Sequence, residues 1–189
     1  MILESINFDD FYTHVQTIFL KHFTIEQVNK IIEFVEILAD ANFRCYKANM
    51  LVIANRKEEG QNYKLISDLE WVARSVGEYR VASKANINRF IHNTKTLKDI
   101  ITADVWVTDD IVYSIGEMMD RLSIETIKRE EFRVNKRPLH MIETSQKISN
   151  RVEKYLIQKL DEIDAKGFYE CVHEQRTYDI EKILDELVI

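Results

Sequence analysis

The scarcity of glycine and proline most limits what this chain can fold into. Four glycines and one proline occur in 189 residues, whereas average usage of about 7% and about 5% would give about 23 such residues. Sheets of short strands need frequent tight turns, and those turns favour these two residues. With 46% hydrophobic and 31% charged residues, the composition predicts an all-α fold, a bundle of about six to eight helices joined by short polar links.

Apolar side chains recur at helical spacing along most of the chain. The first set lies within residues 8–22, and the second follows Thr24, where Gln27 completes the spacing of a capping box. Pro138 and Gly167 suit the beginning and the end of a long later helix. Other sets predict helices that begin near Ser67, near Thr108 and after Thr177, with a further short helix around 87–91.

Two segments predict small amounts of β-structure. The helical period fades across 43–66, where the apolar run from Met50 to Ile53 precedes a polar turn around Gly60. This pattern is compatible with a small β-hairpin near 43–66, although a short apolar run can equally belong to a buried helix. A short extended strand is expected near 168–172, directly after Gly167.

Length and cysteine usage predict one reduced, cytoplasmic domain. The chain can bury a core as a single domain, 1–189, with a subdivision near 100–107 as the alternative. Cys45 and Cys171 lie far apart without a zinc-type spacing, so both are expected to be reduced and buried. No secretory pattern opens the sequence, and no apolar run reaches the roughly 20 residues of a membrane span, so we expect no membrane partner.

The charges are arranged in blocks. The chain carries a net charge of −6, yet residues 71–98 hold six Lys or Arg against one acidic residue, and 128–154 hold eight against four. An acidic protein with two basic segments can contact nucleic acid through those segments, but its negative net charge does not support nucleic-acid binding.

The strongest candidate motif covers residues 115–129, which read Ile-Gly-Glu-Met-Met-Asp-Arg-Leu-Ser-Ile-Glu-Thr-Ile-Lys-Arg. An apolar helix would be followed by a tight turn at Asp120 and Arg121. Ser123 would cap a second helix, and Ile127 would fill the angle between the two. This arrangement resembles the helix-turn-helix of bacterial repressors and sigma-type factors.

The resemblance implies a bacterial-type, non-enzymatic regulatory protein that binds double-stranded DNA. Its second helix would lie in the major groove, where Glu125 would accept a hydrogen bond from a cytosine amine. The open alternative is two ordinary amphipathic segments, or one continuous helix weakened at Gly116 and Ser123. The residues implied in DNA contacts are Ile124, Glu125, Thr126, Lys128, Arg129, Arg133 and Lys136.

No other pattern predicts chemistry. The five histidines have no metal-ligand partners at a recognisable spacing, and the four isolated glycines form no phosphate-binding loop. We therefore predict no catalytic residue, no metal site and no cofactor. Two alternatives to DNA binding remain open: a helical module that binds a protein partner or forms a homodimer, and an enzyme whose site is assembled from distant residues.

Overall fold

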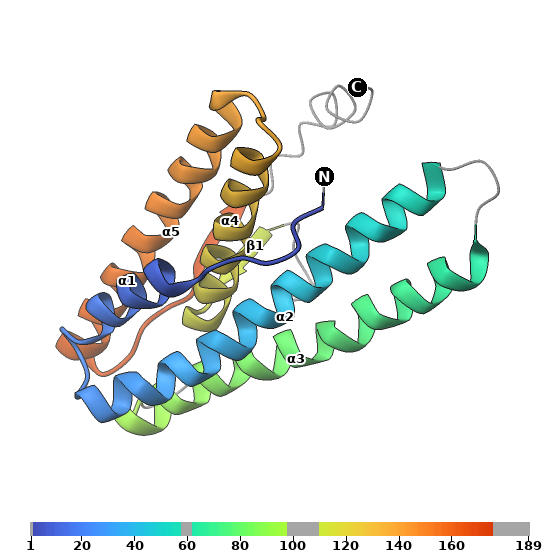
Figure 1. The fold of residues 1–189 in the computed structure, drawn as a ribbon. Coiled ribbons are helices and arrows are strands. Elements are labelled where there is room, and N and C mark those ends of the chain that lie inside the picture. Colours follow the sequence, from blue (N-terminus) through green and yellow to red (C-terminus); the bar gives the residue numbers. More distant parts are fainter. Residues whose placement is uncertain (1, 58–61, 98–109, 176–189) are drawn as a thin grey trace.

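The computed structural model describes residues 2–57, 62–97 and 110–175, and five helices dominate them (Figure 1). This arrangement confirms the mainly helical class, but the predicted number of six to eight helices is wrong for the described chain. The helix predicted after Thr177 and the subdivision predicted near 100–107 lie outside the described residues. The elements are α1 (Asp9–Phe19), α2 (Ile25–Lys57), α3 (Tyr63–Lys95), β1 (Asp110–Tyr113), α4 (Ile115–Val134), α5 (Leu139–Lys166) and β2 (Val172–Gln175).

Helices α2 and α3 form a long hairpin (Figure 1). Each contains 33 residues and is therefore about 50 Å long. The predicted capping box is present at the beginning of α2: the Thr24 N–H donates to Gln27 Oε1 at 3.0 Å, and the Gln27 N–H donates to Thr24 Oγ1 at 3.4 Å. Asn62 caps α3 by accepting from the Leu65 N–H at 3.1 Å.

The β-hairpin predicted near 43–66 is wrong, because α2 continues to Lys57 and α3 begins at Tyr63. The apolar run that suggested a strand lies on a helix with one side covered. Val52 is buried against the partner helix, whereas Leu51 and Ile53 are 37% and 48% exposed. Apolar residues occupy both the covered and the exposed face of this part of α2, so the sequence shows no clear helical period here.

The helices predicted near Ser67 and around 87–91 are both parts of α3. Polar residues interrupt the apolar period along α3, but their side chains bond to α4 and its N-cap. Lys84 Nζ lies 2.8 Å from Glu117 Oε1, and Asn88 Nδ2 donates to Ser114 Oγ at 3.0 Å. Tertiary contacts therefore continue a helix that the local pattern divides.

Helix α4 packs against this hairpin, and α5 packs beside α4 (Figure 1). Ser114 caps α4 by accepting from the Glu117 N–H at 3.2 Å. The predicted boundaries of the long later helix are confirmed, since Pro138 immediately precedes α5 and Gly167 ends it with a φ of +72°. Only glycine adopts that left-handed conformation without strain.

Gly116 lies where the backbones of α4 and α3 are close together. A Cβ atom at this position would lie 2.5 Å from the Lys84 carbonyl oxygen. The absence of a side chain therefore lets the two helix backbones approach each other.

A short antiparallel ribbon joins β1 to β2, with Asp110 opposite Gln175 and Tyr113 opposite Val172. The extended segment predicted near 168–172 overlaps this second strand only at Val172. Tyr113 is buried, and its ring lies tilted against that of Tyr155 of α5, with ring centroids 6.3 Å apart.

The main hydrophobic core lies under one half of the hairpin. Its members on α2 lie between Val28 and Leu38, and its members on α3 are Ile87 and Ile91, all essentially inaccessible to solvent. Residues of α1, α4 and α5 complete it. None of the described helices combines the length and the apolarity that a membrane crossing requires.

Candidate functional site

The segment that resembles a helix-turn-helix lies within the single continuous helix α4. No turn forms at Asp120 and Arg121. Ser123 sits mid-helix, where its hydroxyl donates to the Asp120 carbonyl at 2.9 Å and accepts from Asn42 Nδ2 at 2.7 Å. Asp120 and Ser123, which suggested a turn and a helix start, are thus buried and bonded to Asn42 of α2. The two-helix geometry is absent from this segment, and DNA binding itself stays a prediction.

The residues predicted to contact DNA have very different environments along α4. Glu125 is fully buried, and Ile124, Thr126, Lys128 and Arg129 are partly buried. Arg133 and Lys136 are exposed, and Lys136 follows the helix with a φ of +52°. The seven residues therefore do not form one accessible face.

Glu125 is the centre of a buried charge network. Its Oε1 lies 3.0 Å from Arg121 Nη2 and 3.2 Å from Lys128 Nζ. Its Oε2 accepts from Ser145 Oγ of α5 at 2.7 Å. Since every oxygen of this carboxylate has a partner, Glu125 joins α4 to α5 rather than facing a base edge.

A second buried network joins α4 to the hairpin through Asp120. Arg80 of α3 donates to both carboxylate oxygens, at 3.2 Å and 2.7 Å, and Asn42 of α2 donates to Oδ1 at 2.9 Å. Burial alone would lower the pKa of Arg80, but its hydrogen bonds to Asp120 and the charge of that carboxylate raise it. The charge of this arginine is therefore paired with a carboxylate.

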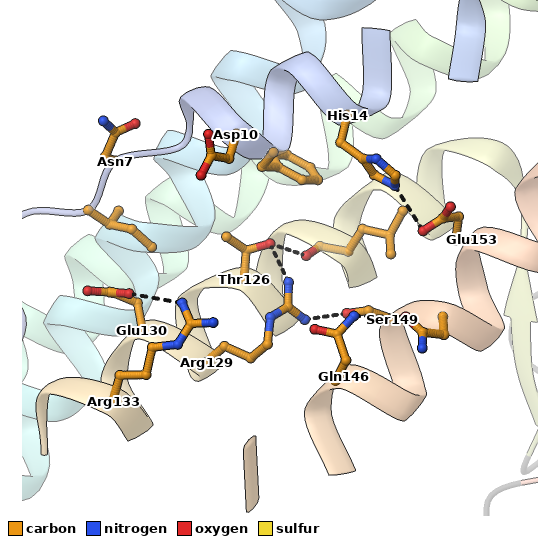
Figure 2. Close-up of a pocket in the computed structure, with 14 residues that line it drawn as sticks. Asn7, Asp10, His14, Thr126, Arg129, Glu130, Arg133, Gln146, Ser149 and Glu153 are labelled. Carbon is orange, nitrogen blue, oxygen red and sulfur yellow. Dashed lines mark hydrogen bonds and ion pairs between the residues drawn. The ribbon is translucent and has the colours of Figure 1, made fainter. Parts of the chain in front are cut away.

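The opposite side of α4 borders a polar cleft of about 690 Å³, shown in Figure 2. The cleft lies between α1, α4 and α5, and its size falls in the range of about 300–1,000 Å³ that is typical of small-molecule sites. It is lined by Ile6, Asn7, Asp10, Phe11, His14, Leu122, Thr126, Arg129, Glu130, Arg133, Gln146, Ser149, Asn150 and Glu153.

Arg129 lies at the floor of this cleft. Its Nη1 donates to Ser149 Oγ and its Nη2 donates to Thr126 Oγ1 at 3.2 Å (Figure 2). Within the described residues no carboxylate bonds to it. Burial lowers the pKa of Arg129, and the neighbouring charge of Arg133 lowers it further, while Glu125 acts in the opposite direction. Both guanidinium groups are partly buried, but Arg80 pairs with a carboxylate, whereas Arg129 bonds to two hydroxyl groups.

Charges of both signs surround Arg129 in the cleft. Arg133 Nη1 lies 3.6 Å from Glu130 Oε2 on the same helix. His14 of α1 approaches Glu153 of α5, with 2.9 Å between Nε2 and Oε2. Asp10 lies one helical turn before His14 and is exposed on the same wall (Figure 2). The cleft therefore combines the carboxylates of Asp10, Glu130 and Glu153 with the guanidinium groups of Arg129 and Arg133.

Asp10 and His14 lie four residues apart and share a face of α1 by periodicity, but this spacing does not indicate the cleft. Two arginines four residues apart, Arg129 and Arg133, share a helix face by periodicity alone. Their neighbours on α1 and α5 are contributed by other parts of the chain, and no local pattern predicts such contacts.

A separate feature is the end of the hairpin, here called the distal arm: residues 48–57 of α2 and 63–79 of α3. Figure 1 shows that it extends beyond α1, α4 and α5. Its buried apolar residues are Ala48, Val52 and Ile66. Its exposed large apolar residues are Leu51 (37%), Ile53 (48%), Tyr63 (76%), Leu65 (39%), Trp71 (68%), Val72 (38%) and Tyr79 (64%).

The described residues contain no group of three or more His, Cys, Asp or Glu side chains that could hold a metal ion. Cys45 and Cys171 form no disulfide. Both were expected to be buried, but in the structure they are only partly buried. Burial raises the pKa of both thiols, so they are mainly protonated near neutral pH.

Comparisons with family models, with curated proteins and with solved structures found no match to this chain. The functional argument therefore depends on the geometry of the molecule.

Proposed function

We propose that this protein is a helical interaction module that pairs with a second copy of itself through the distal arm. The observation that carries the proposal is a row of partly exposed apolar residues on α3 with the spacing of a coiled-coil seam. The row consists of Leu65, Leu69, Val72, Val76 and Tyr79.

The intervals along this row alternate between four and three residues, which keeps apolar side chains on one stripe of a helix. Leu65, Val72 and Tyr79 are between 38% and 64% exposed. Leu69 and Val76 are partly buried. A seam of this kind is covered when a partner helix lies along it.

A second copy is the occupant that the local charges favour. Residues 48–79 contain four Lys or Arg and five Asp or Glu, so two arms would bring together little net charge. Two-fold pairing is the commonest symmetry among oligomers, and two helical hairpins side by side make a four-helix bundle. The apolar side chains of one arm would then be covered by those of the other.

The proposal predicts that substituting one seam residue abolishes pairing. Val72→Glu places a carboxylate in the buried seam, and burying an unpaired charge costs several kcal/mol. We therefore expect the dissociation constant of the pair to rise at least about a hundredfold. Sedimentation equilibrium measures this change as a shift from twice the 22.4 kDa chain mass towards the single mass.

Val81→Glu is the matched control. Val81 lies on the same helix, is 62% exposed and, nine residues from Val72, points to the opposite side at about 100° per residue. It should pair as the wild type does. A wild-type chain that stays at 22.4 kDa up to millimolar concentration would contradict the proposal, and so would equal pairing by both variants.

A further inference from the structure

Arg129 is a partly buried guanidinium to which no carboxylate of the described residues bonds. A partly buried charge is unfavourable unless a group of opposite charge or a set of hydrogen-bond acceptors compensates it. Arg129 has two neutral hydroxyl acceptors for its five N–H donors. Arg133, four residues further along the same helix, adds a second positive charge at the same end of the cleft.

We propose that this cleft binds a small zwitterionic ligand, whose carboxylate lies between Arg129 and Arg133 and whose amine faces Asp10 on α1. A planar carboxylate matches the fork of a guanidinium and accepts two parallel hydrogen bonds from it. The cleft of about 690 Å³ has room for a ligand of this class.

Amide side chains at the same end of the cleft support anion binding. Gln146 Nε2 donates to Asn150 Oδ1 at 2.8 Å, so the two amides of α5 are held in one orientation. This bond leaves a second N–H on Gln146 and both N–H groups of Asn150 as further donors. Ser149, between them in sequence, already orients Arg129.

The acidic wall limits the ligand class. Asp10 and the Glu153–His14 pair lie across the cleft from the arginines, and Glu130 lies beside Arg133. A group with several negative charges would be repelled by these carboxylates. A ligand with one carboxylate and one amine satisfies both walls.

The test is a titration of the full chain with glycine, β-alanine and 4-aminobutyrate, which separate the two charges by increasing distances. Acetate and inorganic phosphate are the comparison probes. The NMR signal of the Arg129 Nε–H group reports binding at the proposed site. We expect a saturable shift of this signal with at least one amino acid, at lower concentration than with acetate or phosphate.

Arg129→Gln should weaken amino-acid binding about tenfold or more, because a charged donor is lost; calorimetry measures this change. Arg44→Gln is the control, since Arg44 is exposed and pairs with Asp40 outside the cleft. Asp10→Asn, a surface change, should remove the preference for amino acids over acetate while acetate still binds. It keeps the test valid if Arg129→Gln does not fold.

Three results would overturn the inference. They are the absence of a saturable Arg129 shift with every amino acid, unchanged affinity in Arg129→Gln, and tighter binding of phosphate than of any amino acid. None of these results depends on whether the distal arm pairs.

Discussion

The two halves of the α2–α3 hairpin share the same pair of helices but differ in what covers them. In the half nearest α1, residues such as Val28, Leu38 and Ile87 are completely buried under three further helices. In the distal arm, Val72 and Tyr79 remain 38% and 64% exposed.

The difference does not come from a loss of apolar residues along the helices. The arm continues the apolar spacing of α3, but no third layer of the described chain lies over it (Figure 1). Apolar surface of this kind is usually covered in a functional assembly. The covered half therefore carries the hydrophobic core, and the open half is the surface for which we propose association with a second copy.

The largest expected difference between the halves is the cost of shortening an apolar side chain. Ile87→Ala removes a fully buried side chain and should lower the free energy of unfolding by about 2–5 kcal/mol. Val72→Ala, measured at a concentration where the chain is single, should cost less than about 1 kcal/mol because the side chain is already exposed. Urea unfolding measures the free energy of unfolding of both variants. An equal decrease in the two would contradict the difference between the halves.

The next effect compares two glycines. Gly116→Ala puts a Cβ atom 2.5 Å from the Lys84 carbonyl oxygen, and we expect the resulting backbone shift to cost about 1–3 kcal/mol. Gly77→Ala in the arm meets no atom within 4 Å and should instead stabilise the helix by about 0.5–1 kcal/mol. In thermal unfolding, Gly116→Ala should lower the melting temperature and Gly77→Ala should raise it. A shift of both in the same direction would contradict the packing described for α4.

The smallest effect concerns an ionic cluster at the covered end of the hairpin. Asp164 Oδ1 lies 2.6 Å from Lys95 Nζ, and its Oδ2 lies 2.7 Å from His22 Nδ1. Burial alone would raise the pKa of Asp164, but the hydrogen bonds from Lys95 and His22 lower it.

A carboxyl group whose pKa is lower in the folded state stabilises the protein above its unfolded pKa of about 3.9, and this stabilisation is lost as the pH falls through the folded value. Because the group is partly exposed, we expect less than about 1 kcal/mol. Asp164→Asn should therefore flatten the acid side of a plot of unfolding free energy against pH. Glu33→Gln, in an exposed pair with Lys30, is the comparison. If Asp164→Asn has the same pH dependence of unfolding free energy as the wild type at acid pH, the cluster does not contribute to stability.

The helices could be predicted from the sequence where local signals agree with packing. The Thr24–Gln27 capping box, Pro138 and Gly167 each fix a helix end by chemistry that acts within a few residues. The signals failed where distant residues decide the structure. Ser123 suggested a helix start, yet in the fold Asn42 bonds to its hydroxyl and α4 continues through it.

The candidate site was predictable only in part for the same reason. The helix-turn-helix resemblance implied DNA contacts for Arg129 and Arg133, and in the structure both line the cleft. Their partners Asp10 and Ser149 lie on other helices, so spacing along the chain carries no information about them. The same resemblance implied an accessible Glu125, but this residue is fully buried and pairs with Arg121. The sequence alone does not distinguish such a buried acid from an exposed one.

Hydrogen exchange measured at low and high protein concentration locates the contact that we propose between two distal arms. We expect amides of residues 63–79 to exchange more slowly as the concentration rises, while those of residues 25–38 exchange at an unchanged rate. Exchange in 63–79 that is independent of concentration, or protection that appears only outside the distal arm, would contradict the proposal.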